Sequence, residues 1–220
     1  PPGVKAIELR TTGPRQFAGM ARSGLGAGVL RLDRAASVAA GSGTMPAAPY
    51  ASLDRGRRSV GIDLKQPDGV ATVLRLCETA AESDATSRPA VVLTSLLLEL
   101  GAKRELMRIA EPQLTAAIAR FPADATLLYG VGMLRVMEDR YAEAVALLRR
   151  VIELEPHHVP ALNNLAMLLA ESAATRNEGM ALVERAIAHR GHQPTLLDTK
   201  GTILLWAGRT TEAVTLLEAA

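Results

Sequence analysis

The sequence is poor in cysteine, in aromatic residues and in long apolar runs. Cys77 is the single cysteine, so no disulfide can form within the chain, and a reducing compartment is expected. Aromatic residues make up only 3% of the chain, which leaves Leu, Val, Ile, Ala and Met to build the core. The longest apolar run, 90–100, is interrupted by Thr94, Ser95 and Glu99 and is far shorter than the ~20 residues that cross a membrane. These absences predict a cytoplasmic protein without a membrane partner.

Charge is distributed unevenly along the chain. Residues 1–80 contain 11 Lys and Arg against 6 Asp and Glu, whereas the remainder contains 14 against 17. This asymmetry predicts two segments of different origin. The basic excess is too small and too scattered for a nucleic-acid-binding stripe, so we expect no nucleic-acid partner. Because the chain begins at Pro1 without Met and its last repeat lacks a polar capping helix, we expect a piece of a longer protein.

Residues 1–81 alternate between strand-like and helix-like patterns. Strands are predicted at 4–9, 28–33 and 59–64, with helices at 14–23 and from 67 to about 76. This order predicts a short, incomplete α/β (βαβ) segment ahead of a mainly α chain. Cys77 is expected to be a small buried hydrophobe on the second of these helices. A polar junction at 82–88 follows, and residues 89–220 show helix patterns only.

The part from 89 to 220 carries an internal repeat of 34–35 residues. Pro122, Pro156 and Gly191 punctuate it at that spacing. Small residues recur in register between them, at Gly132, Ala166 and Gly201, then at Ala144, Gly179 and Ala213, and seven later at Val151, Ala186 and Ala220. Small side chains let two helices cross closely, and larger residues then fill the space between hairpins: Leu128, Leu148, Leu162, Leu165, Leu182 and Leu217. The alternative, a helical bundle with accidental spacing, does not explain a register kept over three units.

Two segments, 139–144 and 207–213, resemble the turn and second-helix start of a tetratricopeptide (TPR) repeat. The resemblance implies a TPR-like α-solenoid of three to four helical hairpins. A weaker fourth unit precedes the other three, with Ala110, Ala117 and Pro122 in register. It departs from the pattern at Pro112, where we expect the helix to kink or restart.

A solenoid of this kind implies a partner protein or peptide on its concave face, lined by the first helix of each hairpin. The residues expected there are Tyr129, Met133, Asn163, Asn164, Met167, Asp198 and Thr202. The asparagines are suited to pair with the backbone of an extended peptide, and the methionines adapt to its side chains. The lysine-and-asparagine clamp with which some relatives hold acidic C-termini is not matched, which disfavours that ligand.

Residues 1–80 resemble the N-terminus of the family III CoA-transferases, the group that includes the acyl-CoA racemases. The matching segments are 3–9, 13–14, 25–27, 29–34 and 55–65. The resemblance implies a CoA-binding edge in which Arg34, Arg57 and Arg58 lie near the adenine or phosphates, CoA being the cofactor it suggests. Directly after residues 25–27 the family usually has an acidic or polar residue, whereas this chain has Gly28. The family's catalytic carboxylate lies beyond the matched part.

Other constellations favour plain structural roles. The glycines at 24–28 follow a predicted helix and precede a strand, the reverse of a dinucleotide-binding loop. His189 and His192 are three apart but have no acidic or cysteine partner nearby, so we predict no metal site. No catalytic residues are identified.

Two functions remain open from the sequence. The first is a protein-interaction scaffold whose N-terminal segment is not catalytic. The second is a fragment of a CoA-thioester enzyme, a CoA-transferase or acyl-CoA racemase, completed by missing residues or another chain. The missing catalytic acid favours the first, so we do not expect an enzyme. The sequence does not address the partner's identity or self-association.

Overall fold

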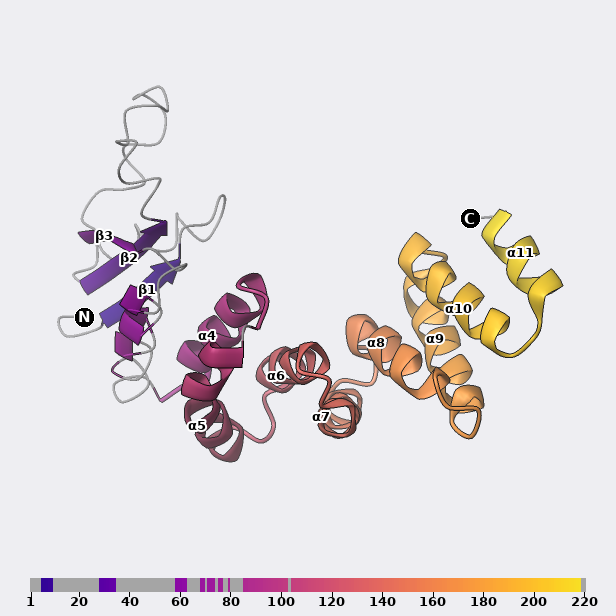
Figure 1. Cartoon of the computed structure of the whole chain (residues 1–220), viewed down its shortest axis with the longest axis horizontal. Coiled ribbons are helices and arrows are strands. Elements are labelled where there is room, and N and C mark those ends of the chain that lie inside the picture. The colour runs from indigo at the N-terminus through magenta and orange to yellow at the C-terminus, as the bar shows by residue number, and fades with distance from the viewer. Residues whose placement is uncertain are drawn as a thin grey trace, which may run out of the picture. The chain divides into compact units, whose positions relative to one another are not determined.

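In the computed structural model the chain forms two compact units, Pro1–Gln113 and Leu114–Ala220 (Figure 1). The residues that the structure describes are 5–9, 28–34, 58–62, 68–69, 71–73, 75–76, 79, 85–102 and 104–218. The junction predicted at 82–88 stays a prediction. The predicted helix at 14–23 and Cys77 lie outside the described residues.

The first unit contains a small parallel sheet. Strands β1 (Lys5–Leu9), β2 (Gly28–Arg34) and β3 (Arg58–Ile62) pair in the order β1-β2-β3. Lys5 pairs with Gly28 at the start of the first ladder, and Leu30 pairs with Arg58 at the start of the second. Each of the three strands overlaps one of the strands predicted from the sequence, at 4–9, 28–33 and 59–64.

Helices complete the first unit and lead into the second. The described residues from 68 to 79 are helical, and the Thr72 hydroxyl donates to the carbonyl of Asp68, one turn back. Helix α4 (Arg88–Glu99) follows, and then α5 (Arg104–Arg120). Of the kink or restart expected at Pro112, the restart is wrong, because α5 continues through that residue, and the kink stays a prediction. A proline within a helix removes one i→i−4 hydrogen bond, and this long helix retains the bonds on either side.

The second unit contains the last residues of α5, from Leu114 on, followed by three helical hairpins. The hairpins are α6 (Ala125–Met137) with α7 (Tyr141–Leu154), α8 (Val159–Ala170) with α9 (Arg176–Arg190), and α10 (Pro194–Trp206) with α11 (Thr210–Glu218). Each first helix starts at a local signal. The Asp124 carboxylate accepts from the backbone N–H of Leu127 at 2.8 Å, and the His158 Nδ1 accepts from that of Ala161 at 3.1 Å. Helix α10 begins at Pro194, whose fixed φ suits the first turn.

Turns at equivalent places of the first and third hairpins have the same geometry. Asp139 and Gly208 both adopt positive φ, 59° and 76°. The following residue then donates its N–H to a carbonyl of the first helix, Arg140 to Arg135 and Arg209 to Leu204, each at 2.9 Å. The turn between α8 and α9 is longer, which places the extra residue of the 35-residue repeat there.

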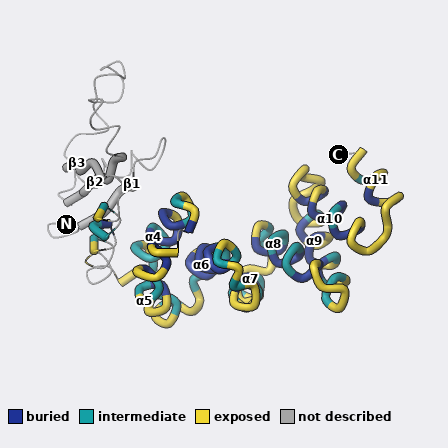
Figure 2. Tube along the Cα trace, in the orientation of Figure 1, coloured by how far each residue is buried: buried dark blue, intermediate teal, exposed yellow. Residues whose placement is uncertain are grey.

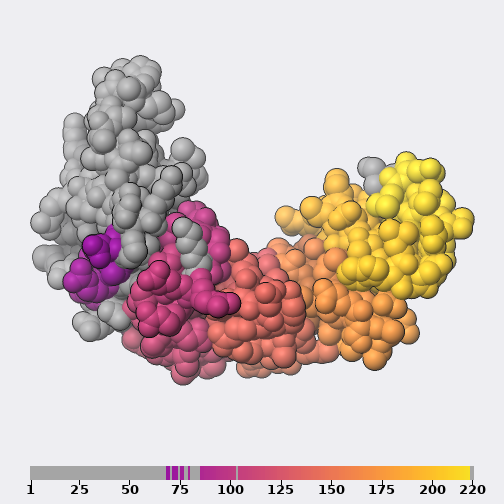
Figure 3. Space-filling view, in the orientation of Figure 1, coloured from indigo at the N-terminus to yellow at the C-terminus, as the bar shows by residue number. Residues whose placement is uncertain are grey.

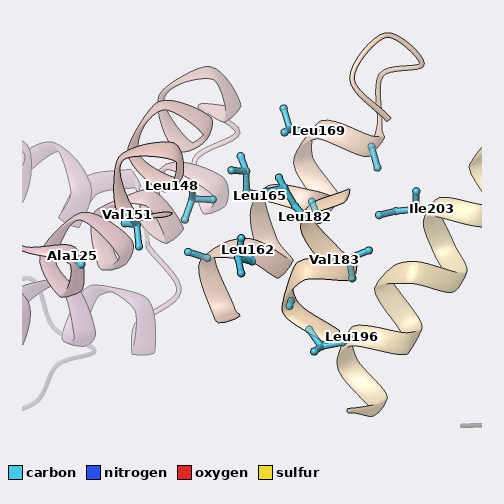
Figure 4. Close-up of a cluster of buried hydrophobic side chains, with 14 of the residues drawn as sticks. Ala125, Leu148, Val151, Leu162, Leu165, Leu169, Leu182, Val183, Leu196 and Ile203 are labelled. Carbon is cyan, nitrogen blue, oxygen red and sulfur yellow. The ribbon is translucent and has the colours of Figure 1, made fainter. Parts of the chain in front are cut away.

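The repeated small residues lie where helices cross. Gly132, Ala166 and Gly201 on the first helices are buried, as are Ala144, Gly179 and Ala213 on the second. Figure 4 shows large side chains of the same buried cluster: Leu165 of α8 and Leu182 of α9 belong to it, and Leu196 and Ile203 of α10 lie on the side of α9. The predicted register of the repeat is therefore confirmed in all three hairpins, apart from Ala220, which lies outside the described residues.

One predicted core residue is not buried. Leu217 is 44% exposed, whereas the other five leucines expected between hairpins are buried. Its side chain packs over Gly201 where α11 contacts α10, and the residues that the structure describes leave the rest of it exposed (Figure 2). The error arises because the repeat pattern marks a packing position without saying whether a neighbour covers it.

Candidate protein-binding surface

The first helices of the three hairpins form one layer of the second unit. Helix α8 contacts α10 as well as its own partner α9. Asn164 on α8 also bridges to α6, where its Nδ2 donates to the Tyr129 hydroxyl at 3.0 Å and lies 3.1 Å from the Met133 sulfur. Neighbouring hairpins adjoin without a break in the space-filling view of this unit (Figure 3). Side chains on one face of this layer can therefore contact a single partner.

We define the first-helix strip as the residues that recur, at repeat spacing, on one face of α6, α8 and α10. Positions i, i+3, i+7 and i+11 of a helix lie within about a quarter of its circumference. The strip comprises Thr126, Tyr129, Met133 and Met137 on α6, Pro160, Asn163, Met167 and Glu171 at α8, and Thr195, Asp198, Thr202 and Trp206 on α10. Six of the seven residues expected at the concave face belong to it, and Asn164 adjoins it.

The α6 end of the strip is fixed by polar and aromatic contacts. Tyr129 packs its ring against His158 with centroids 4.9 Å apart, and its hydroxyl accepts from Asn164. Burial raises the pKa of the Tyr129 hydroxyl, an effect that the hydrogen bond from Asn164 partly opposes. Asn164 thus joins two hairpins, and its Nδ2 is already engaged in doing so.

The middle of the strip holds an unusual asparagine. Asn163 is half-buried, and its Oδ1 is covered by protein without a hydrogen-bond partner in the described part of the chain. A buried acceptor left unpaired costs on the order of 1–3 kcal/mol. Met167 and Thr202 beside it are half-buried, and Asp198 is exposed. The strip therefore offers acceptors and adaptable apolar side chains.

Basic residues are absent from the strip. The first helices contain two cations, Arg135 and Lys200, and both are engaged elsewhere. Arg135 is only 3% exposed and pairs with Glu138 at 2.8 Å, and Lys200 pairs with Glu184 on α9 at 2.9 Å. In contrast, neither Glu171 nor Asp198 forms an ion pair with any residue that the structure describes.

Carboxylates also gather where α6 and α8 end. The Tyr141 hydroxyl donates to Asp139 Oδ1 at 2.7 Å. That hydrogen bond and the charge of Asp139, with lesser effects of desolvation and of Glu171, raise the pKa of Tyr141. Arg176 lies across the same turn, where its guanidinium donates to the carbonyls of Ala170 and Glu171 and keeps its positive charge. This end of the strip therefore carries charges of both signs.

Some contacts between hairpins have no signal in the local sequence. His157, after α7, stacks on His189 of α9 with centroids 4.5 Å apart and ring planes 12° from parallel. Arg149 of α7 pairs with Glu178 of α9 at 2.6 Å. These partners are 29 to 32 residues apart, so only the repeat register could have brought them together. Within the described residues, no cluster of three or more His, Cys, Asp or Glu suited to a metal is found.

Two of the three arginines expected near CoA lie in the sheet of the first unit. Arg34 ends β2 opposite Ile62, whereas Arg58 begins β3 opposite Leu30. Four residues of strand separate those positions, about 13 Å at ~3.3 Å per residue. Arg57 lies outside the described residues. Among the helices that the structure describes, none is long and apolar enough to cross a membrane.

Comparisons with known proteins find two kinds of similar protein. No protein-family model matches the chain. Alpha-methylacyl-CoA racemase of Homo sapiens is 37% identical over 78 residues, 34% of this chain, and that of Mus musculus is 35% identical over 78 residues. A TPR repeat-containing protein of Pseudomonas aeruginosa is 27% identical over 168 residues, 74% of this chain. The chain spans only 18% of the racemases and 28% of the Pseudomonas protein.

Solved structures support the helical part of the fold. MamA matches with a TM-score of 0.57 at 16% identity, over 69% of this chain and 80% of the MamA chain. MamA of Desulfovibrio magneticus RS-1 matches with the same TM-score at 14% identity, over 69% of this chain and 83% of its own. The chain is therefore mainly helical with a TPR-like α-solenoid, and it resembles a TPR protein over 74% of its length and the human racemase over 34%.

Proposed function

We propose that the second unit binds an extended segment of a partner protein along the first-helix strip. The observation that carries this proposal is the composition of the strip. It places exposed or half-buried methionine, tyrosine, tryptophan and asparagine in register on three neighbouring helices. Flexible thioethers adapt to varied side chains, and aromatic and amide groups supply anchors and hydrogen bonds. Burial of these large side chains in the protein's own core would have stabilised the fold. Their position at the surface therefore favours a role in binding.

A panning experiment tests the proposal. Random 12-residue peptides displayed on phage are selected on the immobilised full chain, and enriched peptides are measured by fluorescence anisotropy. The double variant Thr126→Trp/Thr195→Trp blocks the strip, because both threonines are exposed second residues of first helices. Thr211→Trp is the matched control, at the exposed second residue of α11, a second helix.

We expect the strip variant to weaken binding on the order of tenfold or more, whereas the control binds as the unmodified chain does. Circular dichroism confirms that each variant is folded. The proposal fails if no peptide is enriched, or if the control weakens binding and the strip variant does not.

We further propose that residues 1–81 are a CoA-binding edge without catalytic activity. The supporting observation is the 37% identity to the racemase over 78 residues, which covers only 18% of that enzyme. Chemistry at an acyl thioester requires a positioned acid, base or nucleophile, and by resemblance that group lies outside the matched part. Calorimetric titration with CoA should detect weak binding, and an assay for loss of chirality at the acyl α-carbon should detect no turnover. Turnover abolished by replacing a carboxylate of this chain would favour the alternative, an enzyme fragment.

A further inference from the structure

We infer that the partner segment held on the first-helix strip is cationic, carrying lysine or arginine beside apolar side chains. This inference rests on the proposed function and specifies its ligand. It is drawn from the distribution of charge over α6, α8 and α10.

The charged side chains of the strip are all negative. Its twelve residues include the carboxylates Glu171 and Asp198 and no lysine or arginine. Asp198 is exposed in the middle of α10, on the face shared by Asn163 and Tyr129 at the equivalent positions of α8 and α6. An incoming ammonium or guanidinium group gains the attraction of an unpaired carboxylate, whereas an acidic segment meets repulsion and no basic group.

The arginine and the lysine of the first helices already form ion pairs. Arg135 is buried with Glu138, and Lys200 projects to Glu184 on α9. Neither can turn to a ligand on the strip without breaking its ion pair. The arginine and lysine of the first helices are therefore held away from the strip, whereas Asp198 is left on it, and Arg176 lies only at the Glu171 end.

The strip also contains a hydrogen-bond acceptor that has no donor among the residues that the structure describes. The unpaired Oδ1 of Asn163 lacks a donor in the described part of the chain. Rotation of that half-buried side chain toward a ligand N–H would relieve the cost of the unpaired acceptor. Lysine and arginine carry three and five N–H donors and no acceptor, so they match a surface rich in acceptors. The apolar flanks follow from Met133, Met167 and Trp206, which offer surface that a hydrated charge alone does not cover.

The whole chain does not supply this attraction by itself. Its formal net charge is +2, although residues 81–220 contain 14 Lys and Arg against 17 Asp and Glu. The comparison of a charge reversal on the strip with one outside it therefore separates local attraction from attraction to the rest of this part.

The test uses the full chain and the panned 12-residue peptides. Asp198→Lys reverses the charge at the centre of the strip. Glu155→Lys is the matched control, because Glu155 is exposed in the turn after α7, outside the strip, and its carboxylate has no hydrogen bond or ion pair within the described part of the chain. Dissociation constants are measured by fluorescence anisotropy at low and at high salt.

We expect the enriched peptides to contain lysine or arginine and to bind more weakly at high salt. Replacing an attraction by a repulsion of similar size, each worth up to about 1 kcal/mol at an exposed pair, should weaken binding about tenfold in Asp198→Lys. Glu155→Lys should change it less than about twofold. Circular dichroism of Asp198→Lys should match the unmodified chain, since the site is exposed.

Two results separate failure of the inference from failure of the proposed function. Enriched peptides that lack basic residues, bind equally well to Asp198→Lys and are blocked by Thr126→Trp/Thr195→Trp would overturn the cationic ligand and keep the surface. Enrichment of acidic peptides that bind Asp198→Lys more tightly would do the same. If no peptide is enriched, both the function and its ligand are overturned.

Discussion

Replacing Gly179 by alanine should destabilise the second unit, although alanine is the better helix former. A Cβ built on Gly179 of α9 would lie 2.6 Å from the backbone oxygen of Ala166 and 3.2 Å from the Cβ of Ala170, both on α8. Backbone cannot turn aside, so the two helices must separate. Alanine in place of glycine gains roughly 0.5–1 kcal/mol of helix stability. Overpacking of a core costs about 1–3 kcal/mol, so we expect a net loss of about 1–2 kcal/mol.

Two other glycines of the repeat are matched controls. A Cβ on Gly132 would lie 3.5 Å from Leu147 and Leu148, which is ordinary contact, so Gly132→Ala should stabilise by roughly 0.5–1 kcal/mol. A Cβ on Gly201 would lie 3.1 Å from Leu217, whose half-exposed side chain can move, so Gly201→Ala should be close to neutral.

Urea unfolding followed by tryptophan fluorescence measures these differences in the correct unit. Trp206 is the single tryptophan and lies at the end of α10, so its emission reports the second unit. Circular dichroism provides the second probe. The packing argument is refuted if Gly179→Ala is as stable as the unmodified chain, or if Gly132→Ala is the less stable of the two.

Two further predictions concern polar side chains. Asn164→Ala should lower the free energy of unfolding by about 0.5–1.5 kcal/mol, because it removes the hydrogen bond to Tyr129. Asn163→Ala should change it by less than about 0.5 kcal/mol, because it removes an acceptor that has no partner in the described part of the chain. Equal losses of stability in urea unfolding would contradict this. The hydrogen bond from Arg140 lowers the pKa of Glu143 below its ordinary value. Its contribution to stability is therefore complete above about pH 4.3 and is lost as the pH falls through the lowered pKa. Since the pair is exposed, Glu143→Gln should reduce stability by only a few tenths of a kcal/mol near neutral pH and by nothing in strong acid; an equal effect under both conditions would show that the pair has no such role.

The hairpins could be predicted from the sequence because close helix crossings impose a steric rule on single residues. Gly132, Ala144 and Ala166 recur at spacings that no other part of the fold requires, and all three are buried. The turns follow the same logic, since the positive φ shared by Asp139 and Gly208 suits an Asp or a Gly.

The contacts between hairpins could not be predicted in the same way. The sequence does not predict that the amide of Asn164 joins α8 to Tyr129 of α6. Its role depends on a rotation of α8 about its axis, which the apolar pattern constrains only roughly. The stack of His157 on His189 likewise depends on how two helix ends meet. Exposure of Leu217 depends on what lies beyond α11, which a repeat pattern does not encode.

Methyl NMR of methionine tests the central claim most directly. The strip contains Met133, Met137 and Met167, whereas Met107 in α5 and Met180 in α9 lie outside it. With methionine methyl groups labelled in the full chain, a peptide enriched by panning is titrated and each signal is assigned by substitution. The account predicts saturable shifts of Met133, Met137 and Met167, with Met107 and Met180 unmoved. Shifts confined to Met107 or Met180, with the three strip methionines unchanged, would contradict it.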